Sequence, residues 1–177
     1  MQEEKVIVVN TFDEPIGLME KLEAHQKGVL HRAFSVLIFN TKGEMLIHQR
    51  AKDKYHCGGL WTNACCSHPR EHETLIEAAN RRLQEEMGFQ TPLTKMGSFI
   101  YKAEFKNGLT EHEFDHLFVG EFNENPSPNP DEVMDWKYIS LADLKNEIQK
   151  NPEDFTFWFK EIMNHHLDKV LNQQNYA

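Results

Sequence analysis

A thiol and an imidazole lie two positions apart in the segment Trp61-Thr-Asn-Ala-Cys-Cys-Ser-His-Pro69. In an extended chain, side chains at positions i and i+2 leave the same face, so Cys66 and His68 can point into one pocket. The helix that we predict after this segment carries two adjacent carboxylates, Glu85 and Glu86, in its last turn. Thiol, imidazole and carboxylate groups brought together could hold a divalent metal or perform acid–base catalysis.

The charged residues of this predicted helix have a regular spacing, which resembles the Nudix box of pyrophosphohydrolases. Two positions depart from the box: Ser67 stands where it opens with glycine, and Arg82 replaces the first glutamate of an Arg-Glu pair. Nudix hydrolases use that glutamate in their metal cluster, so the resemblance implies impaired pyrophosphate hydrolysis. The matching positions are Glu73, Arg81, Glu85, Glu86, Gly88 and Phe89.

The residues just before the box have a second pattern, Thr62-Asn63-x-x-Cys66-x-His68-Pro69. It resembles the type 1 isopentenyl diphosphate isomerases, the Nudix members that move a double bond. The resemblance runs from about the first predicted helix to the last. It implies an α/β (α+β) Nudix fold, with a mixed β-sheet sandwiched between helices. It also implies the interconversion of isopentenyl and dimethylallyl diphosphate in isoprenoid biosynthesis.

The same resemblance implies a metal site built from three histidines and two glutamates. From spacing alone this set would be weak, because its members come from three distant segments and the chain has 10 histidines. Imidazole and carboxylate ligands together suit Zn²⁺, Mn²⁺ or Mg²⁺. The implied ligands are His25, His31, His68, Glu111 and Glu113.

A second ion, Mg²⁺, is implied for the diphosphate of the substrate, with Glu86 as its protein ligand. Four cationic residues match positions that contact the diphosphate in this family. Each alone would be an ordinary surface charge, but together they could neutralise a diphosphate. The cation at position 82 favours holding the phosphates over cutting them. The four residues are Lys21, Arg50, Lys54 and Arg82.

The acid–base pair that the resemblance implies is Cys66 and Glu113, and either could be the proton donor. Tyr101 would lie beside Glu113, and Trp158 over the reacting carbons, where an indole face can stabilise a carbocation. Plainer roles exist for these residues. Most free cysteines are small buried hydrophobes, and an aromatic cluster such as the one around Trp158 is more often core than site.

Two other functions stay open. A Nudix pyrophosphohydrolase needs an acid at position 82, where this chain has arginine, although Glu85 and Glu86 remain. A non-catalytic module that senses a metal or a nucleotide is the third candidate. It would predict a degraded acid–base pair, whereas Cys66 and Glu113 are both present.

Hydrophobic patterning predicts one domain over residues 1–177, with a core at about 30–145 and a helical C-terminal segment at 141–172. The strand at 32–39 is apolar enough to lie in the centre of the sheet. Residues 51–59 form a polar loop, and residues 12–16 could pair back on the first strand. We predict strands at 6–9, 32–39, 45–50, 93–105, 109–122 and 134–139, and helices at 18–26, 141–149 and 154–171, besides the box helix.

The composition of the chain excludes some kinds of binding partner and indicates a cellular location. The chain has 177 residues and a formal net charge of −9, which argues against nucleic acid or anionic membrane as the main partner. No apolar run approaches the ~20 residues of a membrane span, and the first residues lack the shape of a signal peptide. Three cysteines make a poor disulfide framework, so a cytoplasmic location is expected. The expected partner is a small-molecule diphosphate, and the oligomeric state is open.

Overall fold

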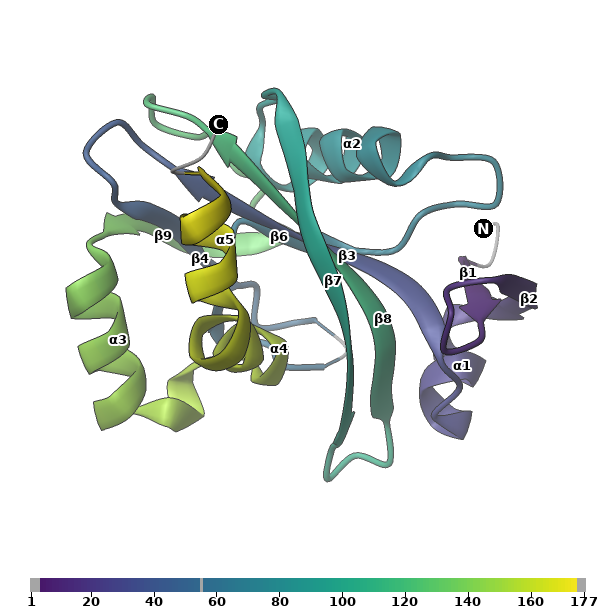
Figure 1. The fold of residues 1–177 in the computed structure, drawn as a ribbon. Coiled ribbons are helices and arrows are strands. Elements are labelled where there is room, and N and C mark those ends of the chain that lie inside the picture. The colour runs from purple at the N-terminus through teal and green to yellow at the C-terminus, as the bar shows by residue number, and fades with distance from the viewer. Residues whose placement is uncertain (1–3, 55, 175–177) are drawn as a thin grey trace.

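The computed structural model describes residues 4–54 and 56–174 (Figure 1). Nine strands of these residues form one mixed sheet. The strands are β1 (Lys5–Val9), β2 (Pro15–Glu20), β3 (His31–Phe39), β4 (Met45–Arg50), β5 (Trp61–Thr62), β6 (Cys65–Ser67), β7 (Leu93–Glu104), β8 (Thr110–Glu121) and β9 (Val133–Ile139). The α-helices are α1 (Lys21–Lys27), α2 (Leu75–Met87), α3 (Leu141–Lys150), α4 (Phe157–Glu161) and α5 (Leu167–Gln174).

Strand β3 lies at the centre of the sheet, as its apolar sequence predicts. It pairs in parallel with β8 and antiparallel with β1, β4 and β6. Its successive side chains Val36, Leu37 and Ile38 are all fully buried, which requires packing on both faces of the sheet. This position brings residues of β3, β6 and β8 side by side, although they lie far apart in the sequence.

Helices cover both faces of the sheet (Figure 1). Leu37 belongs to a hydrophobic cluster shared with α3, α4 and α5, whereas Ile38 belongs to the cluster shared with α2. The predicted fold class, a mixed sheet sandwiched between helices, is therefore confirmed. None of the helices in the described residues is long and apolar enough to cross a membrane.

Helix α2 begins and ends where local sequence signals place it. The side chain of Thr74 accepts a hydrogen bond from the backbone of Glu77, whose own side chain bonds back to Thr74, forming a capping box. At the other end Gly88 adopts φ 78°, a left-handed conformation that favours glycine. A Cβ atom at Gly88 would lie 2.2 Å from the carbonyl oxygen of Ser127, so a larger residue would displace that loop.

Two predicted helices have different bounds in the structure. The first begins at Lys21 and not at residue 18, because Leu18 and Met19 pair with Ile7 and Val6 in a β-hairpin. Pairing with β1 satisfies their backbone groups, and this tertiary contact outweighs the helical spacing of their apolar side chains.

The predicted C-terminal helix at 154–171 is interrupted. Phe155 is extended and bridges to Trp61, and the backbone N–H of Thr156 donates to the Trp61 carbonyl at 3.0 Å. The α-helix therefore begins only at Phe157, and a π-helical turn at Ile162–His166 separates α4 from α5. The contact with β5 sets this start and brings Trp158 to the pocket described below.

Candidate active site

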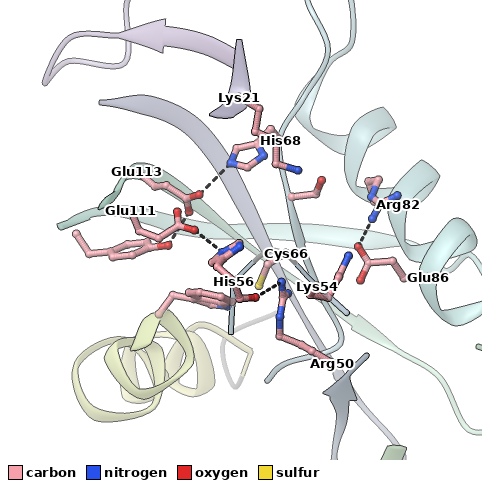
Figure 2. A pocket seen from close by; sticks show the side chains of 13 residues that line it. Lys21, Arg50, Lys54, His56, Cys66, His68, Arg82, Glu86, Glu111 and Glu113 are labelled. Carbon is pink, nitrogen blue, oxygen red and sulfur yellow. Dashed lines mark hydrogen bonds and ion pairs between the residues drawn. The ribbon is translucent and has the colours of Figure 1, made fainter. Parts of the chain in front are cut away.

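Three carboxylates lie at alternate positions along one face of β8: Glu111, Glu113 and Asp115. All three are buried, with exposed fractions of 3%, 8% and 0%. Alternation along a strand places such residues on one face, which the sequence predicts for the first two. Figure 2 shows Glu111 and Glu113 with their partner histidines at one end of a pocket.

Imidazoles from α1, from β3 and from the segment after β6 meet beside these carboxylates. One ligand atom each of His25, His31, His68 and Glu113 lies within 4.8 Å of all the others. Glu111 joins them through its Oε2, which is 3.2 Å from His25 Nε2. The structure thus brings together all five residues that the sequence analysis names as ligands of one divalent ion.

The donor atoms of this cluster fit a divalent cation. His31 Nε2 is buried and has no hydrogen-bond partner within the described residues; the nearest Glu113 oxygen is 3.6 Å away. Burial lowers the pKa of His68 to about 4, so its imidazole is neutral, which is the form that binds metals. Burial opposes ionisation of Glu113, but the neighbouring imidazoles of His31 and His68 hold its pKa well below the usual range.

A fourth histidine, His56, reaches the cluster from the loop between β4 and β5. Its Nε2 lies 2.6 Å from Glu111 Oε1 (Figure 2). Burial and the neighbouring Glu113 oppose ionisation of Glu111, yet hydrogen bonds from His25 and His56 lower its pKa. The sequence analysis missed His56, because a polar loop has no periodicity that predicts which of its side chains points inward.

Cys66 lies on β6 with its thiol between two polar side chains. Its Sγ is 3.0 Å from Asn63 Oδ1 and 3.3 Å from Ser35 Oγ. Burial raises the pKa of the Cys66 thiol, and Asp115 adds to that effect. Cys65, the next residue along the strand, points to the opposite face and is fully buried in the cluster beneath α2.

A chain of hydrogen bonds links this thiol to the indole of Trp158. Trp158 Nε1 donates to Thr62 Oγ1 at 3.1 Å, and Thr62 Oγ1 donates to Asn63 Oδ1 at 3.0 Å. Both amide hydrogens of Asn63 bind backbone carbonyls, at 3.0 and 2.9 Å, so its Oδ1 must face the thiol. Thr62 and Asn63 therefore fix the position of the Trp158 indole relative to the Cys66 thiol.

Tyr101 supports the second predicted acid–base residue. It pairs directly opposite Glu113 in the β7–β8 ladder, and its Oη donates to Glu113 Oε2 at 2.8 Å. Burial raises the pKa of Tyr101 well above its usual range, so the phenol keeps its proton. Tyr101, Glu113, Cys66 and Trp158 all line one pocket.

Cations also line this pocket, and Arg82 lies across it from Glu111 and Glu113 (Figure 2). Arg82 Nη2 lies 2.5 Å from Glu86 Oε1, and Lys54 pairs with Glu132. The Arg50 guanidinium lies 5.5 Å from the centre of the Trp158 ring. All four cations of the sequence analysis, Lys21, Arg50, Lys54 and Arg82, line the pocket.

The two adjacent carboxylates of the box helix have different positions. Glu86 is buried and lines the pocket, and burial raises its pKa against the opposing effect of Arg82. Glu85 is exposed and pairs with Arg81 and Arg82 on the helix surface. Only Glu86 of the two is therefore placed to face a ligand.

The fold and the site define a known class of protein. A family model described as the NUDIX domain matches residues 29–159, so the chain belongs to the NUDIX family. A crystal structure of a Deinococcus radiodurans protein has a TM-score of 0.68 at 18% identity, covering 83% of this chain and 90% of that one. The MutT protein of Methanosarcina mazei has a TM-score of 0.65 at 18% identity, with coverages of 84% and 96%.

Curated relatives define the family more closely. Isopentenyl-diphosphate Delta-isomerase 2 of Photorhabdus laumondii is 51% identical over 92% of each chain. Isopentenyl-diphosphate Delta-isomerase of Serratia proteamaculans is 48% identical over 91% of this chain and 90% of its own. The resemblance stated from the sequence is confirmed, and the chain belongs to the isopentenyl-diphosphate Delta-isomerase family.

Proposed function

We propose that this chain is a metal-dependent isomerase that interconverts isopentenyl diphosphate and dimethylallyl diphosphate in isoprenoid biosynthesis. The observation that supports this most directly is the composition of one pocket. A thiol and a tyrosine-supported carboxylate, Cys66 and Glu113, share it with four cations. The first two suit proton transfer to and from carbon, and the cations suit a diphosphate. Relatives that are 45–51% identical are named for this activity.

Moving the double bond requires one proton to be added and another removed, so two groups must act on the five-carbon chain. Protonation of the terminal alkene carbon produces a tertiary carbocation-like state, and loss of a proton from the neighbouring methylene forms the new double bond. Cys66 and Glu113 are the pair we assign to these steps: one donates a proton to the terminal alkene carbon, and the other accepts a different proton from the methylene.

Two aromatic side chains support this chemistry. Tyr101 donates to Glu113 Oε2 at 2.8 Å and so fixes the direction of that carboxylate. Trp158 is held by its bond to Thr62, and its indole face can stabilise the cation while excluding water. Water must be kept out because its addition to the cation would give an alcohol.

The ligands proposed for one divalent ion, Zn²⁺, Mn²⁺ or Mg²⁺, are His25, His31, His68, Glu111 and Glu113. When bound, the ion would polarise the Glu113 carboxylate. His56 lies behind Glu111 at 2.6 Å, and we assign it the task of orienting that carboxylate toward the ion.

Glu86 is the protein ligand we propose for Mg²⁺ carried by the diphosphate. Lys21, Arg50, Lys54 and Arg82 would bind the phosphate oxygens directly. Binding energy gained at the phosphates orients the reacting carbons between Cys66 and Glu113, because the two parts of the substrate are covalently joined.

A cytoplasmic location completes the proposal. The three cysteines, Cys57, Cys65 and Cys66, are all free thiols. A reducing compartment would keep them so, and the proposed role of Cys66 needs a free thiol.

Proton NMR of isopentenyl diphosphate in D₂O with Mg²⁺ tests the function. We expect dimethylallyl diphosphate with deuterium in a methyl group, and we expect EDTA to abolish the conversion. Release of phosphate or pyrophosphate without isomerisation would place the chain among the hydrolases. No reaction in a folded, metal-loaded sample would favour a sensing module.

The acid–base assignment is tested by Cys66→Ala and Glu113→Gln. Each should lower kcat by about 10²-fold or more, the range of general acid–base catalysis. Cys57→Ala and Glu121→Gln are the matched controls, since neither residue lines the pocket. Full activity in either Cys66→Ala or Glu113→Gln would exclude that residue from the mechanism.

A further inference from the structure

Two polar side chains that the proposed mechanism does not use lie behind the thiol of Cys66. Ser35 stands directly opposite Cys66 in the β3–β6 ladder, and its Oγ is 3.3 Å from Sγ. The same hydroxyl is 2.7 Å from Asp115 Oδ2, on the neighbouring strand β8. Ser35 and Asp115 have exposed fractions of 1% and 0%, so this chain of three groups is closed to solvent on the inner side.

The direction of these hydrogen bonds follows from counting protons. A serine hydroxyl has one hydrogen; when Asp115 is ionised, Ser35 donates that hydrogen to the carboxylate, and the Ser35 oxygen then accepts from the thiol. Asn63 Oδ1 is also an acceptor, because both amide hydrogens of that side chain bind backbone carbonyls. The single S–H hydrogen of Cys66 therefore lies between two acceptors, one on each side.

A carboxyl group at position 115 lowers the stability of the folded state, so a role in folding alone does not explain Asp115. It forms no ion pair within the described residues, and its Oδ1 has no hydrogen-bond partner among them. A buried polar atom left unsatisfied typically costs about 1–3 kcal/mol, and an apolar side chain here would avoid that cost. Its one side-chain bond in the described residues leads through Ser35 to Cys66.

We propose that Asp115 and Ser35 are positioning residues for Cys66. Asp115 fixes the hydroxyl direction of Ser35, and Ser35 together with Asn63 holds the Cys66 sulfur in place at the wall of the pocket. This inference rests on the proposed function, in which Cys66 exchanges a proton with the substrate. Small errors in the placement of a reacting group can cost about 10²-fold in rate, so the positioning has a measurable effect.

The first test compares Ser35→Ala, Asp115→Asn and the double variant, with Ser98→Ala as a control that removes a surface hydroxyl from β7. The carboxamide introduced by Asp115→Asn can donate to Ser35 and release its proton to turn toward the thiol. We expect kcat to fall about 10-fold in each single variant, with KM unchanged within about twofold. The double variant should lose no more than Ser35→Ala alone, because Asp115 acts through Ser35.

The second test measures the reactivity of the Cys66 thiol and does not depend on isomerase activity. At one fixed pH, alkylation by iodoacetamide is followed by mass spectrometry at Cys66 and, as an internal reference, at Cys57, which is partly exposed and lies outside the pocket. Loss of the Ser35 hydroxyl should change the Cys66 rate by about 2- to 10-fold, the factor that one hydrogen bond represents. The Cys57 rate should not change.

Two results would overturn the inference. One is a Ser35→Ala protein with wild-type kcat and a wild-type Cys66 alkylation rate. The other is a set of variants whose losses of kcat add up in the double variant and follow their melting temperatures, which indicates a purely structural role. If the wild-type protein is not an isomerase, the proposed function fails, and the alkylation rates still decide whether Ser35 and Asp115 hold the thiol.

Discussion

The guanidinium of Arg82 lies 2.5 Å from the carboxylate of Glu86, one helical turn further along α2. Two further acids contact the same guanidinium, Glu85 at 2.6 Å and Glu132 at 3.4 Å. In the Nudix box, position 82 is a glutamate of the hydrolase metal cluster. The arginine places a positive charge among the remaining acids, so this end of the pocket can bind phosphate oxygens where a hydrolase would assemble several carboxylates around metal ions.

We therefore predict that Arg82→Ala raises KM for isopentenyl diphosphate by about 10-fold or more, with a smaller effect on kcat. The reason is that a charge-assisted bond to phosphate, typically about 1.5–3 kcal/mol, contributes to ground-state and transition-state binding alike. Steady-state kinetics measure the effect, and Lys52→Ala, an exposed cation of the neighbouring loop, is the control. A fall in kcat at unchanged KM would instead give Arg82 a role in the chemical step.

Removal of the divalent ion should lower both activity and stability. Ligands that face each other within 4.8 Å lose a shared partner when the ion leaves, and binding to the native state alone stabilises it. We expect dialysis against EDTA to abolish isomerisation and to lower the melting temperature, and Zn²⁺, Mn²⁺ and Mg²⁺ can then be tried in turn for recovery.

His25→Ala and His112→Ala provide the matched pair for this experiment. His112 lies on β8 between the two glutamates but bonds to the Gly28 carbonyl at 3.0 Å, on the other side of the strand. Metal content should fall in His25→Ala only. Equal metal content in both variants would contradict the proposed ligand set.

His56→Ala should weaken metal binding without removing it. The residue contacts Glu111, one of the proposed ligands, and is not itself a member of the group whose ligand atoms lie within 4.8 Å of one another. Loss of such an orienting partner typically costs about 10- to 100-fold in metal affinity. Titration calorimetry of the metal-free protein measures it, and Asp53→Ala, an exposed change in the same loop, should bind as the wild type does. An unchanged affinity in His56→Ala would remove His56 from the metal centre.

His48 should make the protein acid-sensitive. This fully buried residue bonds to the Ala64 carbonyl, and burial together with Arg50 lowers its pKa from 6.5 to about 3. Between these values the unfolded chain binds a proton that the native state does not, so stability falls as pH drops below 6.5. The loss at pH 5 is roughly 2 kcal/mol for this one group.

Urea unfolding from pH 7 to pH 5 measures this dependence. In His48→Gln, which cannot be protonated, the curve of stability against pH should be shallower than in the wild type. His72→Gln is the control, because His72 is exposed. Identical slopes in wild type and His48→Gln would show that His48 does not titrate between its folded and unfolded values.

Several parts of the fold could be predicted because local physics specifies them. The apolar run of β3 requires burial on both faces, and the capping residues Thr74 and Gly88 mark both ends of α2. Where the prediction was wrong, a contact with a distant segment determined the local secondary structure. Leu18 and Met19 form a strand because they pair with β1. The α-helix α4 begins after Phe155 because Phe155 forms a bridge with Trp61. The assignment of residues 1–177 to a single domain stays a prediction.

By itself, the sequence determined the chemical types of the site residues and their local alternation. Cys66 beside His68, and Glu111 beside Glu113, share a face because every second residue of an extended chain does. Only the tertiary structure decided which distant groups they meet. The parallel pairing of β3 with β8 puts His31 opposite Glu113, and the β3–β6 ladder puts Ser35 opposite Cys66. The loop residue His56 and the buried Asp115 gain their partners only from these long-range contacts, because nothing in their own neighbourhood along the chain specifies them.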